Sequence, residues 1–134
     1  MKLTGRAISK GCASGEALVT AHAISFLGSI DPKTGVVIER GHELHGLSVK
    51  DRVLVFPHGK GSTVGSYVIY QLSKNGTAPC AMVNEESEPI VAVGAIISGI
   101  PLVDRVAISR IRTGDMVSVD GDMGIVTISD NHSA

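Results

Sequence analysis

The apolar positions of this chain fall into short runs that are separated by glycine-containing turns. Residues 6–8 and 16–19 have the composition of strands, and the glycines between them predict a turn region at 11–15. The run 52–56 is a further strand candidate and ends at Pro57, which cannot donate to a strand ladder. The first part of the chain therefore predicts strands rather than long helices.

The last third of the chain alternates regularly between apolar and polar positions. Residues 116–120 and 124–128 alternate on either side of an Asp-Gly-Asp turn, which predicts a β-hairpin. Earlier in the chain, the Asp-Pro-Lys-Thr-Gly segment 31–35 predicts a turn before the apolar run 36–38. We expect the polar tail 129–134 to fray.

Two segments have a helical or an ambiguous pattern. Residues 66–72 predict a helix, and the Asn-Gly pair at 75–76 is a typical stop signal. After the polar loop 84–89, the run 90–93 predicts a buried strand. Its continuation 94–98 fits either a strand or a short helix.

Composition places these elements in one mixed α/β domain. The chain has 134 residues, of which 43 % are hydrophobic, 19 % charged and 3 % aromatic. This length supports one core, built from Val, Ile, Leu and Ala, and no linker or repeat divides residues 1–134. The pattern therefore predicts one layered domain.

Charge and cysteine content exclude several classes of function. A net charge of −1 disfavours a nucleic-acid binder, which needs clustered basic charge. The longest strongly apolar run, 90–97, is too short to cross a membrane, and the N-terminus lacks the apolar core of a signal peptide, so we expect a cytoplasmic protein. Cys12 and Cys80 lack zinc or iron–sulfur spacing, so we expect no metal to be bound by this chain alone.

The stretch 59–66, Gly-Lys-Gly-Ser-Thr-Val-Gly-Ser, lies between a predicted strand and a predicted helix. Such a turn presents N–H groups and the positive end of a helix dipole to an anion. A nucleotide P-loop is excluded, because Gly61 separates Lys60 from Ser62 and the required earlier glycine is missing. A hydrolase elbow is excluded because Gly65 lies one residue too far from Ser62, in a chain too short for that fold.

Two uses of this loop remain open at this point. Ser62 could accept a proton if N–H groups, the helix dipole and Lys60 stabilise its alkoxide. Alternatively, Ser62, Thr63 or Ser66 is the N-cap of the following helix and has no chemical role.

Several segments resemble the small, swivelling domain of the aconitase X family. In chain order they are 24–29, 31–35, 42–46, 59–66 and 75–79, so that the match covers residues up to about 105. The resemblance implies a swivelling β/β/α domain with mixed β-sheets or a partial barrel and one to three helices. It also implies the free-standing archaeal form, which is the small subunit of a two-chain dehydratase.

The resemblance further implies roles for individual residues. Ser62 would be the catalytic base. Five other residues would bind the substrate: Lys60, Gly61, Thr63, Ser25 and Gly28. The large subunit is expected to hold an iron–sulfur cluster ([4Fe-4S]), which acts as a Lewis acid on the leaving hydroxyl.

The implied substrate is (R)-5-phosphomevalonate, a phosphorylated hydroxy acid of an archaeal mevalonate pathway; hydroxyproline or another hydroxy acid is the alternative. Aconitases proper carry an Arg soon after the catalytic serine, whereas Thr63 and Val64 stand here. Lys60 or the large subunit would therefore have to hold the substrate carboxylate.

A second resemblance suggests an alternative function. Residues 114–126 are similar to the hairpin that ends the phosphohistidine domains of phosphoenolpyruvate-using enzymes, which are also swivelling domains. The alternative is thus a phosphohistidine-type carrier or anion-binding module. That function needs a histidine in a Gly-x-Thr-Ser-His-type loop, and none of the five histidines has this context: His22, His42, His45, His58 and His132.

The remaining polar residues have a plain interpretation beside a functional one. His42 and His45, three apart, could share a metal, but a structural or surface role is favoured. His58 either tunes Ser62 or lies on the surface. The glutamates of the polar loop, which are Glu85, Glu86 and Glu88, either are solvated or contact a partner subunit.

Overall fold

The computed structural model describes residues 1–129. Eight strands form a sheet in the order β1-β8-β7-β3-β4-β5-β6-β2. The strands are β1 (Lys2–Thr4), β2 (Arg6–Ser9), β3 (Cys12–Val19), β4 (Val53–Phe56), β5 (Ala81–Asn84), β6 (Leu102–Asp104), β7 (Met116–Asp120) and β8 (Ile125–Ser129). The helices are α1 (Phe26–Ser29), α2 (Gly65–Lys74), α3 (Pro89–Ser98) and the short 3-10 helix η1 (Ile108–Arg110).

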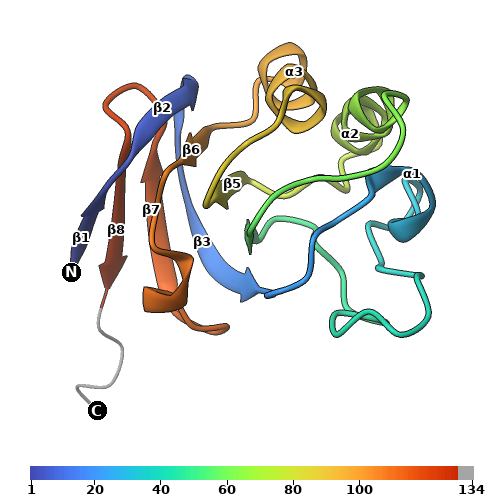
Figure 1. The fold of residues 1–134 in the computed structure, drawn as a ribbon, viewed down its shortest axis with the longest axis horizontal. Helices are drawn as coiled ribbons and strands as arrows, with labels where there is room; N and C mark the ends of the chain where they lie inside the picture. Colours follow the sequence, from blue (N-terminus) through green and yellow to red (C-terminus); the bar gives the residue numbers. More distant parts are fainter. Residues whose placement is uncertain (130–134) are drawn as a thin grey trace.

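The sheet has two halves that share the long strand β3. Residues 12–16 of β3 pair with β7 in the antiparallel half, which also contains β8 and β1. Residues 17–19 of β3 pair with β4 in the parallel half, which continues through β5 to β6. Figure 1 shows α1, α2 and α3 gathered beside the parallel half, with β1, β8 and β7 at the other end of the molecule.

The two ends of the strand order are neighbours in the chain, because only Gly5 separates β1 from β2. The sheet therefore curls toward a partial barrel. Val53 and Val55 of β4 join a core in which side chains of both halves meet. Leu54 and Phe56 face the opposite way, into the core beneath the helices. The strand is buried on both faces, which explains its unbroken apolar run.

The strand that the sequence predicts at 90–93 is wrong, because these residues belong to the helix α3. Residues 94–98, which fitted either a strand or a helix, continue the same helix. Pro89 occupies the start of the helix, and the Glu88 side chain accepts hydrogen bonds from two N–H groups of the first turn. Gly99, with φ of +70°, ends it. The run is so uniformly apolar that its periodicity carries no signal, whereas the residues at its two ends do.

The turn region predicted at 11–15 is also corrected, because β3 already begins at Cys12. Gly15 is paired with Val117 inside the ladder. A Cβ at Gly15 would lie 3.0 Å from both the Asp51 carbonyl oxygen and the Cys80 sulfur. Glycine is required there by close packing rather than by a turn.

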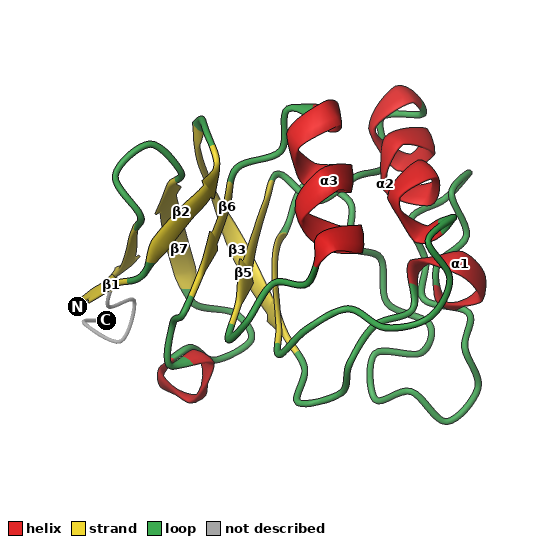
Figure 2. Ribbon diagram, turned by 45° about the horizontal axis from the view of Figure 1, so that its top comes forward, coloured by secondary structure: helices red, strands yellow, loops and turns green. Residues whose placement is uncertain are grey.

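Other expectations hold with small changes of boundary. The predicted C-terminal hairpin is confirmed as β7 and β8, and the helix predicted at 66–72 is α2. The predicted mixed α/β architecture, with a partly closed sheet and three α-helices, is confirmed, and Figure 2 shows α2 and α3 side by side. Of the predicted tail, residues 130–134 lie outside the described residues. Within residues 1–129, no helix has the length and apolarity needed to cross a membrane.

Candidate functional site

The glycine-rich stretch leaves the parallel half at the end of β4 and enters α2; residues 59–65 are called the Ser62 loop below. Gly59 forms a parallel bridge with Ile24, and the Lys60 N–H donates to the Ile24 carbonyl at 3.0 Å. The Ile24 N–H in turn donates to the His58 carbonyl at 3.2 Å. The loop is therefore tied to the segment that leads into α1.

Ser62 is exposed near the tip of this loop. Its hydroxyl oxygen accepts the Val64 N–H at 3.1 Å, and its carbonyl accepts the Gly65 N–H at 2.9 Å. Within residues 1–129, the N–H groups of Gly61, Ser62 and Thr63 have no acceptor. Three neighbouring donors therefore remain free beside a hydroxyl that already receives one hydrogen bond.

At the start of α2, none of the three predicted N-cap residues caps the helix. The N-cap position is Val64, and no side chain caps it there. Ser62 meets the N–H two residues ahead, which is a local turn motif rather than a helix cap. Ser66 lies inside the helix, and its hydroxyl donates to the Ile90 carbonyl of α3 at 2.6 Å.

Ser25 and Gly61 of the predicted substrate site lie against one another. Gly61 has φ of +90°, and a Cβ built on it would lie 2.5 Å from the Ser25 hydroxyl oxygen. That hydroxyl donates to the Leu27 carbonyl at 2.9 Å. Gly28 follows in the kinked helix α1 with φ of +93° and open space where a Cβ would stand. Glycine is favoured at position 28 because φ is positive there. At position 61 it is favoured by a positive φ and by the lack of room for a Cβ.

Lys60 and Thr63 are exposed on either side of Ser62. Within the described residues, Lys60 takes part in no ion pair. Its ammonium group is therefore available to an external anion. His58 is also exposed, and one of its ring nitrogens, Nδ1, lies 2.8 Å from the Gly59 carbonyl oxygen, so that the ring is engaged with the loop backbone.

Glu88 packs against the Ser62 loop, a contact that was not predicted from the sequence. A Cβ at Gly59 would lie 2.5 Å from the Glu88 Oε1 atom and from Val91 Cγ2. The capped first turn of α3 therefore presses on the base of the Ser62 loop. The available signal was the order Glu88-Pro89, since an acceptor side chain directly before proline is typical of a helix start. The solvated role considered for Glu88 is thus wrong, while Glu85 and Glu86 are exposed.

The pair His42 and His45 does not form a metal site. His45 is exposed, whereas His42 is buried with its ring 5.0 Å from that of His22. His42 Nδ1 accepts the Leu44 N–H at 3.1 Å, which places the ring proton on Nε2 and leaves no lone pair there for a metal. Hydrogen bonds from Thr20 and from the Ala21 N–H lower the pKa of the neighbouring Glu43.

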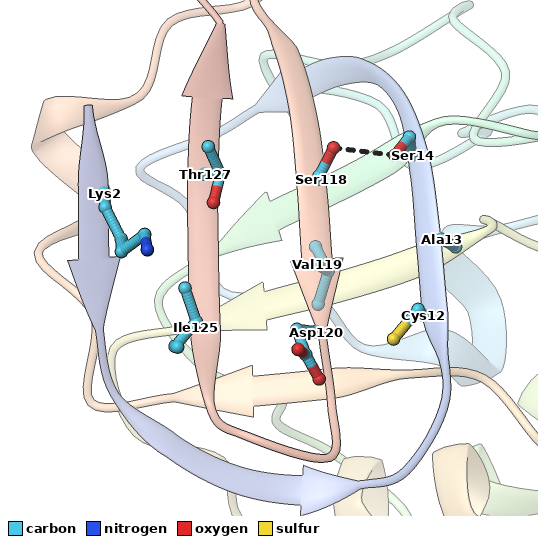
Figure 3. Close-up of a pocket in the computed structure, with 9 residues that line it drawn as sticks. All are labelled: Lys2, Cys12, Ala13, Ser14, Ser118, Val119, Asp120, Ile125 and Thr127. Carbon is cyan, nitrogen blue, oxygen red and sulfur yellow. Dashed lines mark hydrogen bonds between the residues drawn. The ribbon is translucent and has the colours of Figure 1, made fainter.

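A hollow of about 430 Å³ lies elsewhere, on the outer face of the antiparallel half (Figure 3). Cys12, Asp120 and Asp122 have ligand-type atoms within 4.8 Å of one another at its end. The carboxylates already accept backbone N–H groups: Asp120 from Asp122 and Met123 in the hairpin turn, and Asp122 from Gly11, which directly precedes β3. Desolvation and the nearby Asp120 raise the pKa of the Cys12 thiol.

Comparison with known proteins gives one consistent result. Residues 2–128 match the aconitase X swivel domain family. The phosphomevalonate dehydratase small subunit of Methanosarcina acetivorans is 61 % identical over 96 % of this chain and 91 % of its own length. That of Thermococcus sibiricus is 55 % identical over 97 % of this chain and all of its own. The crystal structure of Thermococcus kodakaraensis aconitase X (holo-form) superposes with a TM-score of 0.96, at 52 % identity, over 97 % of this chain and 99 % of that one.

Proposed function

This chain belongs to the aconitase X swivel domain family, and from that premise we propose that it is the small subunit of a two-subunit hydro-lyase. The reaction removes water from (R)-5-phosphomevalonate and gives trans-anhydromevalonate 5-phosphate in an archaeal mevalonate pathway. The observation that carries the substrate is the near full-length similarity to small subunits named for it, from a methanogen and from Thermococcus. A cytoplasmic location is part of the proposal.

Ser62 is the residue through which this chain takes part in the chemistry. Its alkoxide takes a proton from the carbon next to the substrate carboxylate, the electron pair of that C–H bond forms the carbon–carbon double bond, and hydroxide leaves from the adjacent carbon. A serine hydroxyl is a poor base unless its anion is stabilised. The Val64 N–H bonded to the oxygen and the N-terminal end of α2 supply that stabilisation.

The substrate anions are assigned to the groups around Ser62. The N–H groups of Gly61 and Thr63 and the ammonium of Lys60, which have no partner within residues 1–129, suit a carboxylate or a phosphate. Lys60 takes over the task of the arginine that aconitases proper carry after their serine. Ser25 adjoins Gly61, and we assign Ser25 and the nearby Gly28 of α1 to the same substrate site.

The cofactor and the rest of the site are assigned to a large subunit. Iron–sulfur clusters are held by sets of cysteine thiolates, and this chain has two cysteines, so its residues do not fit a [4Fe-4S] cluster. The exposed Ser62 loop is bordered by solvent-facing apolar side chains at Leu27, Val64 and Tyr67, of which Tyr67 is 58 % exposed. We assign this apolar border to the contact with the large subunit, with the chain acting as a single swivelling domain.

The test is the co-expressed two-subunit complex assayed on 5-phosphomevalonate, on hydroxyproline and on a small panel of other hydroxy acids. We expect Ser62→Ala to lower kcat by at least about 10²-fold, the usual size of a lost acid–base group. Ser73→Ala, in the helix α2 that follows the loop, serves as the control. Activity of the isolated chain, or an unchanged rate for Ser62→Ala, would overturn the proposal, and phosphorylation of a histidine would favour the carrier alternative.

A further inference from the structure

The first turn of α3 touches both ends of the Ser62 loop. At the start of the loop, a Cβ on Gly59 would collide with Glu88 and Val91. At its end, a Cβ on Gly65 would lie 3.0 Å from Cγ2 of Ile90. The loop is therefore seated on α3 at two places, and its conformation depends on where α2 sits relative to α3.

Next to the loop, one hydrogen bond between side chain and backbone fixes the position of α2 relative to α3. The Ser66 hydroxyl, partly buried, donates to the Ile90 carbonyl at 2.6 Å. The Ser66 N–H donates to the Thr63 carbonyl at 3.2 Å, so the same residue is also bonded to the loop. Apolar packing allows sliding, whereas a hydrogen bond fixes direction.

We propose that Ser66 is a positioning residue for Ser62. Its hydroxyl anchors the first turn of α2 on α3 and thereby fixes the Val64 N–H that bonds to the Ser62 oxygen. Without that anchor the turn shifts and the donor no longer stabilises the Ser62 alkoxide. This inference rests on the proposed function, because it acts only through Ser62 as a base.

The chain contains a matched control for this role. Ser73, near the other end of α2, also donates its hydroxyl to an α3 carbonyl, that of Ser98, at 3.4 Å. Ser73→Ala removes the same kind of helix-to-helix bond about two helical turns away from the Ser62 loop. A purely structural contribution of Ser66 would therefore be matched by Ser73.

The experiment compares Ser66→Ala, Ser66→Thr and Ser73→Ala in the co-expressed complex with 5-phosphomevalonate as substrate. We expect Ser66→Ala to lower kcat by about tenfold with KM changed less than about twofold, the pattern of an interaction that matters only in the transition state. Ser66→Thr keeps the hydroxyl and should recover most of that loss. Ser73→Ala should leave kcat within about twofold of the wild type.

Three outcomes decide the matter. Full activity of Ser66→Ala overturns the inference, as does an equal loss of kcat in Ser66→Ala and Ser73→Ala. A loss that appears only in KM also overturns it. Ser62→Ala is measured alongside: if it is inactive while Ser66→Ala is normal, only this inference fails, and if Ser62→Ala is active, the proposed function fails first.

Discussion

The antiparallel half and the parallel half each display serine hydroxyls on their surface, and the two displays differ in kind. On the antiparallel half, Ser14 and Ser118 bond to one another across the strands at 2.7 Å, inside a hollow of about 430 Å³ (Figure 3). At the edge of the parallel half, Ser62 stands exposed on a loop with free N–H groups on either side. The hollow offers volume, whereas the loop offers a hydroxyl beside N–H groups that have no acceptor within residues 1–129.

The difference follows from strand direction. Parallel strands need helical crossovers, so the ends of β4 and β5 are followed by the N-termini of α2 and α3, where donors and dipoles gather. Antiparallel strands return through a hairpin that satisfies its own donors and acceptors, as Asp120 does by accepting the N–H groups of Asp122 and Met123. We therefore base the proposed site on donors without a partner within residues 1–129, beside a helix start, and not on concavity alone.

The largest effect is expected where the loop depends on a glycine. Gly61→Ala places a methyl group 2.5 Å from the Ser25 hydroxyl oxygen, at φ of +90°. Ser25 must then turn or the loop must move, and a shift of about 1 Å at a catalytic group is enough to cost about 10²-fold in rate. We therefore expect kcat of the complex to fall by about 10²-fold.

Gly114 separates this loss from backbone strain. It has φ of +97° just before β7, with open space where a Cβ would stand. Both alanine variants lose about 1–2 kcal/mol of stability from the left-handed conformation, measured by urea unfolding. Gly114→Ala should keep kcat within about twofold of the wild type. Equal kcat in the two variants would remove the functional contrast between the halves.

A smaller effect is expected at β2, the edge strand that pairs with β6. The buried carboxylate of Asp104 on β6 accepts two hydrogen bonds from Arg6 on β2 and two from Ser87. Burial alone would raise the pKa of Asp104, but the bonds from Arg6 and Ser87 hold it below its usual value. Asp104→Asn should lower the free energy of unfolding at pH 7 by about 2 kcal/mol.

The pH dependence of that loss identifies its cause. A carboxylate whose pKa is lowered in the folded state stabilises the fold above its unfolded pKa of about 3.9 and loses this contribution as the pH falls through the folded value. The difference between wild type and Asp104→Asn should therefore shrink below about pH 4. Glu86→Gln is the control, because exposed Glu86 faces the same Arg6 at 3.5 Å and should change stability by under about 1 kcal/mol. A pH-independent difference for Asp104→Asn would exclude the ion pair as its source.

The same contrast between the halves explains what the sequence could reveal. The C-terminal hairpin was predictable because one of its faces is solvated, so apolar and polar positions alternate. Segment 90–98 was not, because a run so uniformly apolar has no period, and only Glu88, Pro89 and Gly99 identify the helix. The short strands β1 and β6 were missed because three residues are too few to show alternation.

The candidate site also has one part that was predictable from the sequence and another that was not. The Ser62 loop was predictable because glycine spacing before a helix is a local pattern. The contact of Ser25 with Gly61 and that of Glu88 with Gly59 join residues far apart in the chain, so no local pattern encodes them. Ser66 bonds across 24 positions to Ile90, and in the sequence it is only one of three N-cap candidates.

The smallest effect is expected in the hollow, and it tests whether that face takes part in catalysis. Cys12→Ser should leave kcat of the complex within about twofold of the wild type, because the thiol has a raised pKa and lies away from the Ser62 loop. In a Cys80→Ser background, the pH profile of Cys12 alkylation reports that pKa directly. Asp120→Asn removes a charge that helps to raise the pKa, so alkylation should begin at lower pH, while the desolvation contribution persists. A tenfold loss of kcat in Cys12→Ser would mean that the antiparallel half contributes to the site, and the contrast drawn between the two halves would be wrong.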